Sequence, residues 1–246
     1  MFVNPPPDVR PVVSILYLPD NDTRTAFARE TYDRLEADPY IHDAELIEAI
    51  PDGTIYDTSR KAHEWSLTTD GTHHVCLDDD VKLCEDFGEA ATNALQAVPN
   101  RVVSFFTTHT SADAALERNQ RWFRTEKLWG QAMVMPLQYM EDFLDWCDEF
   151  YGHSSEDVAV NCWNCLEGPG DVWITVPSLV EHCEDEVGGS SVGHNPPCER
   201  TAHLFIDDTT LDPRNVDYSF ELSEIPSSST SMREHCLKSV IAWTDS

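Results

Sequence analysis

Residues 73–87, HHVCLDDDVKLCEDF, lead an apolar strand pattern directly into three consecutive aspartates. Carboxylates in adjacent positions repel one another when they are ionised, and each prefers its own hydration. Asp78, Asp79 and Asp80 therefore predict one of two things: an acidic turn on an acidic protein, or a site for a divalent cation, which binds carboxylate oxygens. The stretch also indicates the fold, because it closes one of several strands that alternate with helices.

Strand and helix patterns alternate through the first half of the chain. Apolar runs predict strands at 11–19, 44–51, 73–79 and 101–107. Helical spacing of apolar residues predicts helices at 20–38, 58–70 and 85–98, the first of them capped by Asp22 or Thr23. This order is typical of an α/β fold with a mostly parallel central sheet flanked by helices.

The second half is less regular. Its patterns predict strands at 128–136, 171–180 and 201–208, and helices at 137–152 and 154–168. No internal repeat and no clear linker interrupts them, and the sequence beyond Asp212 is rich in serine and proline. We therefore expect one domain over 1–212, followed by a C-terminal extension or tail at 213–246.

The charge balance is the unusual part of the composition. Acidic residues outnumber basic ones 45 to 16, and the net charge is −29. Such a charge repels itself, but in about 1 M salt the screening length falls to about 3 Å and most of the repulsion vanishes. Dispersed acid and scarce lysine favour a cytoplasmic protein of a halophile, archaeal or viral, over a merely acidic mesophilic one. The charge makes a broad nucleic-acid surface unlikely, because such surfaces need clustered basic residues.

No signal-peptide pattern is visible at the start of the chain, and no apolar run is long enough to span a membrane. We therefore expect the eight cysteines to be reduced. Cys162 and Cys165 form one CxxC pair, which is either two helical cysteines one turn apart or part of a zinc site with His182, Cys183 and Cys198.

The aspartate stretch, Leu77-Asp78-Asp79-Asp80-Val81, resembles the metal-binding DxD segment of GT-A glycosyltransferases. Other segments resemble family elements in the same order: Ser59-Arg60-Lys61, Trp129-Gly130-Gln131-Ala132 with Met135-Pro136, HSSEDVAVNCW (153–163) and PSLVEHCEDEVGGSSVGH (177–194). The resemblance covers roughly residues 12 to 205, although His182 and Ser190-Ser191 are farther apart than in the family pattern. A haloacid-dehalogenase-like phosphatase fits less well, because Lys82 occupies the Thr/Val position of its DxDx(T/V) motif.

The resemblance implies a single GT-A (Rossmann-like) domain and a metal-dependent glycosyltransferase. Its cofactor would be Mn²⁺ or Mg²⁺, bound by Asp78, Asp80 and a late histidine, either His182 or His194. Its donor would be a nucleotide sugar, most typically a UDP-sugar, contacted by residues drawn from several segments: Asp78, Asp79, Arg60, Gly130, Gln131, Ser190 and Ser191. Asp157, beside Glu156, would be the catalytic base of an inverting displacement.

Two other functions stay open. A sugar-nucleotide nucleotidyltransferase also uses metal-binding aspartates, but it normally has a glycine-rich phosphate loop where this chain reads LPDNDTR (18–24). A non-enzymatic acidic binding protein on the same fold is the other alternative. The acceptor of a transferase is open as well: a glycan, a protein, a lipid-linked sugar or a modified nucleobase.

Overall fold

The computed structural model describes residues 8–125, 128–150, 155–183, 186–187, 201–219, 227–228 and 236. The first part alternates strands and helices as expected: β1 (Pro11–Tyr17), α1 (Asp22–Glu36), β2 (Asp43–Glu48), α2 (Ile55–Ser66) and β3 (His73–Asp78). The later elements follow in the order β4 (Val81–Leu83), α3 (Phe87–Ala97), β5 (Val103–Ser104), α4 (Ser111–Glu117), β6 (Trp122–Thr125), β7 (Ala132–Pro136), η1 (Leu137–Tyr139), α5 (Met140–Phe150), α6 (Glu156–Leu166), β8 (Val172–Thr175), β9 (Val180–His182), η2 (Ile206–Asp208), η3 (Pro213–Asn215) and β10 (Ser227–Ser228).

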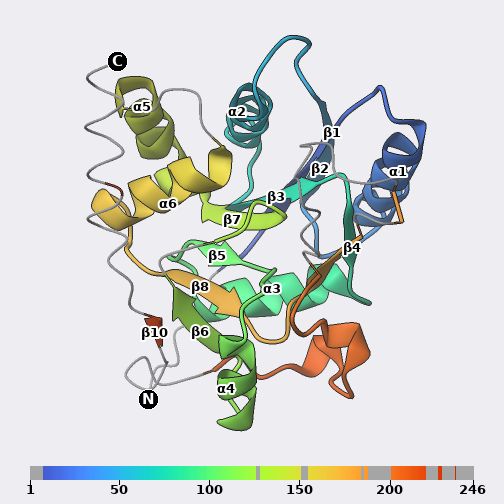
Figure 1. Cartoon of the computed structure of the whole chain (residues 1–246), viewed down its shortest axis with the longest axis vertical. Helices are drawn as coiled ribbons and strands as arrows, with labels where there is room; N and C mark the ends of the chain where they lie inside the picture. Colours follow the sequence, from blue (N-terminus) through green and yellow to red (C-terminus); the bar gives the residue numbers. More distant parts are fainter. Residues whose placement is uncertain are drawn as a thin grey trace.

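These elements confirm a single α/β domain built on one large mixed sheet (Figure 1). Within the described residues the strand order is β10-β6-β8-β5-β7-β3-β1-β2. Strands β2, β1 and β3 are parallel neighbours, whereas β7 runs antiparallel to both β3 and β5. The carboxyl ends of the three parallel strands therefore lie at one edge of the sheet, together with the amino end of β7.

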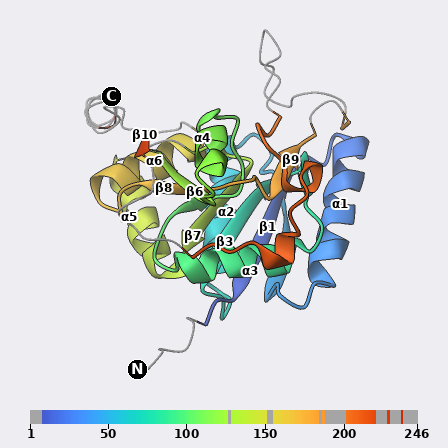
Figure 2. The same ribbon diagram turned by 90° about the horizontal axis from the view of Figure 1, so that it is seen from below.

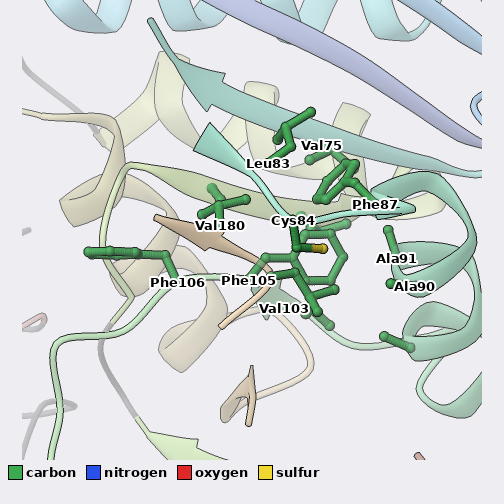
Figure 3. Close-up of a cluster of buried hydrophobic side chains, with 14 of the residues drawn as sticks. Val75, Leu83, Cys84, Phe87, Ala90, Ala91, Val103, Phe105, Phe106 and Val180 are labelled. Atoms are coloured by element: carbon green, nitrogen blue, oxygen red, sulfur yellow. The ribbon is translucent and has the colours of Figure 1, made fainter. Parts of the chain in front are cut away.

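Helices cover both faces of this sheet (Figures 1 and 2). Because side chains alternate across a strand, β3 sends Val75 and Leu77 to one face, and His74 and Cys76 to the other. The first face packs on α1 and α3, and the second on α2, α5 and α6. Figure 3 shows the first core at α3, where Phe87 and the small alanines of that helix lie close to Val75 and Val103.

Several boundaries differ from the sequence expectations. The cap of α1 is Asn21, whose side chain accepts the backbone N–H groups of Thr23 and Arg24, and neither Asp22 nor Thr23 holds that position. The strand expected at 171–180 is two strands, because Pro177 has no N–H to continue the ladder. Its second part, β9, leaves the large sheet and pairs antiparallel with β4. The strand expected at 201–208 is mostly irregular and ends in η2.

Packing of the described chain continues beyond residue 212. Val216 and Tyr218 are buried in the same core as α3, and the Trp122 indole donates to the Tyr218 carbonyl oxygen at 3.2 Å. The domain boundary at 212 stays a prediction. No helix within the described residues is long and apolar enough to cross a membrane.

Salt should stabilise this fold. The net charge of −29 opposes compaction, and ions screen that repulsion. Since each kcal/mol shifts the Tm of a chain of this size by about 2–4 °C, we expect Tm to rise by at least about 5 °C between roughly 0.05 and 1 M KCl. Calorimetry measures the shift, with sucrose as the uncharged control. A Tm that does not respond to KCl would favour the mesophilic alternative.

Candidate active site

A pocket of about 370 Å³ opens at the sheet edge where β1, β2 and β3 end. In open α/β sheets this edge is the usual place for a ligand. The pocket combines an acidic floor with an apolar rim, and its described lining residues are Leu16, Tyr17, Leu18, Arg24, Ala49, Ile50, Gly53, Thr54, Ile55, Thr58, Asp78, Asp79, Asp80, Trp129, Gly130, Gln131, Ser155, Glu156, Asp157 and His182. All three predicted aspartates are therefore in one pocket with both predicted acids of α6.

Arg24 holds two of the aspartates. It comes from the first turn of α1 and is 2% exposed. Its guanidinium pairs with Asp79 Oδ1 through Nη1, and with Asp80 Oδ2 through Nη2 at 2.9 Å. Asp79 Oδ2 also accepts the backbone N–H of Leu18 at 3.2 Å. Asp79 is thus tied into the fold, and its carboxylate links the ends of β1 and β3.

The pairing of β4 with β9 brings His182 to the aspartates. Val81 lies opposite His182 in this antiparallel pair, and the Cys183 N–H donates to the Asp80 carbonyl oxygen at 2.7 Å. The His182 side chain consequently reaches Asp80, with Nε2 at 3.1 Å from Oδ2. His182 is buried, so the imidazole belongs to the floor of the pocket.

Asp78 is the aspartate most strongly perturbed by its surroundings. Burial within the protein, followed by the charges of Asp80 and Asp79, raises the pKa of Asp78 to about 8. For Asp80, contacts with His182 and Arg24 outweigh the cost of burial and lower the pKa of its carboxyl group. Asp78 therefore retains its proton near neutral pH when no further positive charge is present, and a cation bound beside it would favour its ionised form.

Within the described part of the chain, no group of three or more His, Cys, Asp or Glu side chains is arranged to hold a metal ion as it stands. Arg24 occupies Asp79 and one oxygen of Asp80 instead. Two observations nevertheless fit a divalent cation. Asp80 Oδ1 is buried and has no hydrogen-bond partner among the described residues. The 3.1 Å between His182 and Asp80 also suits two neighbouring ligands of one ion, which stand about 3 Å apart when each is about 2.1 Å from the metal.

The second acidic group lies at the amino end of α6, where the helix dipole favours negative charge. Glu156 is buried, and its Oε1 is 2.6 Å from His63 Nε2. Asp157 is half-buried and accepts the N–H of Val158 at 2.9 Å. Of the two acids, Glu156 is held from behind by the protein, whereas Asp157 is the more accessible from the pocket.

Gly130 and Gln131 also line the pocket. The Gln131 carbonyl oxygen accepts the N–H of Asp78 at 3.3 Å, and a Cβ on Gly130 would stand 3.9 Å from Asp78 Oδ2. Arg60 is not among the lining residues, because it pairs with Glu64 and with Asp148 of α5. Ser190, Ser191 and His194 lie outside the described residues, and their roles stay predictions.

Arg24 and His63 were not among the site residues predicted from the sequence. Arg24 lies on the buried face of α1, at helical spacing with Ala28, Thr31 and Leu35. An arginine on the apolar face of the helix that follows the first strand is a signal that could have been read. His63 gives no comparable signal, because its partner Glu156 lies 93 positions further along the chain.

No protein-family model matches this chain, and no curated protein matches it. Solved structures with a similar arrangement of strands and helices do exist. The crystal structure of A197 from STIV has a TM-score of 0.48 and 14% identity, over 72% of this chain and 87% of that one.

Two glycosyltransferases are also among the solved structures to which this chain is similar. One is involved in the glycosylation of the major capsid of PBCV-1, with a TM-score of 0.38 and 11% identity over 74% of this chain and 97% of that one. The other is the galactosyltransferase LgtC, solved with donor and acceptor sugar analogs, with a TM-score of 0.36 and 9% identity over 66% of this chain and 72% of that one.

Proposed function

We propose that this protein is a metal-dependent glycosyltransferase that takes its sugar from a nucleoside diphosphate sugar. The observation that carries the proposal is the acidic floor, where Asp80 has a buried oxygen without a described partner beside His182. A site that gathers three aspartates around one buried arginine is suited to a divalent cation and to the phosphates of a nucleotide sugar.

Asp78, Asp80 and His182 would hold the cation, Mn²⁺ or Mg²⁺. When bound, the metal would act as a Lewis acid that stabilises the charge developing on the leaving diphosphate. Arg24 keeps Asp79 and Asp80 in place, and it adds positive charge to the same side of the pocket. These side chains would therefore bind the diphosphate end of the donor.

The opposite wall would bind the sugar and the acceptor. Gln131 is buried, and its Oε1 has no hydrogen-bond partner among the described residues, so a substrate hydroxyl could donate to it. Asp157 would accept the proton of the attacking hydroxyl group, because it is the accessible carboxylate on this wall. A single displacement with inversion at the anomeric carbon follows from that role.

The two alternatives are less well supported. A nucleotidyltransferase needs backbone N–H groups in a glycine-rich loop after the first strand, and residues 18–24 contain no glycine. A purely structural binding protein gives no reason for a buried carboxylate oxygen without a partner at a pocket, since such an atom destabilises the fold.

Release of free nucleoside diphosphate tests the proposal without knowledge of the acceptor, because transferases can pass the sugar slowly to water. The protein would be incubated in about 1 M KCl with UDP-glucose, UDP-galactose, UDP-N-acetylglucosamine or GDP-mannose, with and without Mn²⁺. We expect release from at least one donor, and only with the metal. If none of these donors is hydrolysed, and calorimetry detects no binding of any of them, the proposal is overturned.

His182 offers a separate prediction about the metal. Replacing His182 by Asn should weaken Mn²⁺ binding by more than about 100-fold, since loss of a ligand should exceed the 10–100-fold typical of outer contacts. Isothermal titration with Mn²⁺ measures this. The control is His203→Asn, which breaks a surface pair with Asp113 at 2.8 Å outside the pocket and should leave Mn²⁺ affinity unchanged. Equal affinities for the two variants would remove His182 from the metal site.

A further inference from the structure

A chain of buried polar side chains lies directly behind the acidic wall of the pocket. Ser14 of β1 contacts His74 of β3, with Oγ at 2.8 Å from Nε2. His74 contacts His63 of α2, with their Nδ1 atoms 3.1 Å apart, and His63 reaches Glu156 of α6 at 2.6 Å. Figure 1 shows α2 and α6 on the same side of the sheet. The four polar side chains connect these two helices to β1 and β3.

All members of this chain are withdrawn from solvent. Ser14, His63, His74 and Glu156 are each at most 5% exposed. Burying polar groups is expensive unless each finds a partner, and an apolar core would have been the simpler filling for this space. Apolar rings already surround it: Phe143 packs edge-on against His63 at 5.5 Å between ring centroids. Packing alone therefore does not explain why polar side chains occupy these positions.

The contacts of the chain fix the orientation of the His63 ring. His63 Nε2 is 2.6 Å from Glu156 Oε1, a distance that suits an ion pair, although the two atoms do not have the geometry of a hydrogen bond. His63 Nδ1 then either accepts from His74 or donates to it, and His74 uses its other nitrogen for the Ser14 hydroxyl. The His63 ring therefore lies between two polar neighbours, and it cannot turn without losing its contacts with His74 and Glu156 at once.

Glu156, the last of the four polar side chains, is the one that reaches the pocket. Glu156 is a lining residue, and its Oε2 lies 4.0 Å from the Cys76 sulfur, a distance that suits a weak S–H donor. Both oxygens of Glu156 therefore have a neighbour on the protein side, which fixes the plane of the carboxylate. Asp157, the next residue, has only a local contact with the backbone of Val158.

We propose that His63, held by His74 and Ser14, is a positioning residue. It fixes the Glu156 carboxylate on the pocket wall, where that carboxylate accepts a hydrogen bond from a hydroxyl group of the bound sugar or acceptor. This role rests on the proposed transferase function for its substrate, but the His63–Glu156 contact itself does not. The two acids would then have different roles: Glu156 would orient a hydroxyl group, and Asp157 would take the proton.

Kinetics of two substitutions test the positioning role. The substrate is whichever of the four nucleotide sugars named above is hydrolysed fastest with Mn²⁺. We expect His63→Leu to lower kcat about 10–100-fold, because a misplacement of about 1 Å can cost that much. His63→Gln keeps an N–H donor for Glu156 and should recover most of the rate. All rates are divided by the folded fraction, which near-UV circular dichroism measures.

His73→Gln is the matched control. His73 is a buried histidine of the same strand as His74, but it contacts Thr72 and the Pro99 carbonyl oxygen, away from the pocket. This variant should retain the wild-type kcat per folded molecule. If His63→Leu also keeps the wild-type kcat, or if His63→Gln is no better than His63→Leu, the positioning role is overturned.

Proton NMR tests the contact independently of any turnover. His63 Nε2 and Glu156 Oε1 stand 2.6 Å apart, and we expect them to share a proton in solution, which should give a strongly downfield signal. We expect that signal in the wild type and in His73→Gln, and its loss in His63→Gln and in Glu156→Gln. Its absence from the wild type would overturn the inference. A wild-type protein that shows the signal but hydrolyses and binds no donor would refute the transferase function, and with it the proposed substrate of Glu156, while keeping the contact.

Discussion

Replacing Asp80 by Asn is expected to lower metal-dependent release of nucleoside diphosphate on the order of 1000-fold, at the upper end of the effects seen when one electrostatic stabiliser is removed. Asp80 lies at the centre of the proposed metal site. Its Oδ2 contacts both Arg24 and His182, and its Oδ1 is the buried oxygen without a described partner. An amide in that place has lost the negative charge that a hard cation requires.

The assay is the donor panel described above, run with saturating Mn²⁺. Asp33→Asn is the control, because it makes the same change of charge on the exposed face of α1. That variant should be indistinguishable from the wild type. If Asp80→Asn hydrolyses the donor at the wild-type rate, the three aspartates would be an acidic turn and not a metal site.

Replacing Arg24 by Met is expected to destabilise the protein by about 3–5 kcal/mol, the usual result of removing one partner from a buried ion pair. The guanidinium is the counter-charge of Asp79 and Asp80, and both carboxylates are themselves buried. Without Arg24 they would face each other at the pocket floor with only His182 to offset Asp80. Methionine replaces the length of the side chain, so the loss would be mainly electrostatic.

Urea unfolding at neutral pH measures the change, and Arg60→Met is its matched control. Arg60 also pairs with an aspartate, Asp148, but the two side chains are 29% and 59% exposed. A surface pair of this kind contributes at most about 1 kcal/mol. Similar losses of free energy of unfolding in the two variants would show that Arg24 has no special structural role at the pocket.

The α/β fold could be predicted from local patterns, and it is confirmed. Alternating apolar runs and helical spacings depend on near neighbours in the chain, so they located β1, β2, β3 and the helices between them. The end of β3 was equally readable, because the apolar pattern stops at the aspartates. Boundaries that depend on one side chain were less so: Asn21 caps α1 because its oxygen reaches two N–H groups.

The arrangement of the candidate site depended on contacts between distant segments. His182 reaches Asp80 because β9 pairs with β4, and that pairing joins strands about 100 positions apart. Arg24 is a site residue because α1 packs on β1 and β2, which brings the guanidinium to Asp79 and Asp80 just beyond the end of β3. The position of Arg24 on the apolar face of α1 is a local signal, but neither contact with the aspartates has a local pattern, since the free energy that selects them comes from packing elements distant in sequence against one another.

Residue types and their order along the chain therefore predicted the α/β class and the acidic edge of the sheet, and the resemblance to GT-A glycosyltransferases suggested the roles of Asp78, Asp80 and Asp157, which stay predictions. Tertiary packing alone decided which cations face those carboxylates, and it placed Arg24 at the pocket and Arg60 on the surface. It also brought together the buried polar side chains of Ser14, His74, His63 and Glu156. The physical reason is that a charge or a hydrogen bond acts over a few ångströms in space, whereas the residues that share it are separated by tens of positions in the sequence.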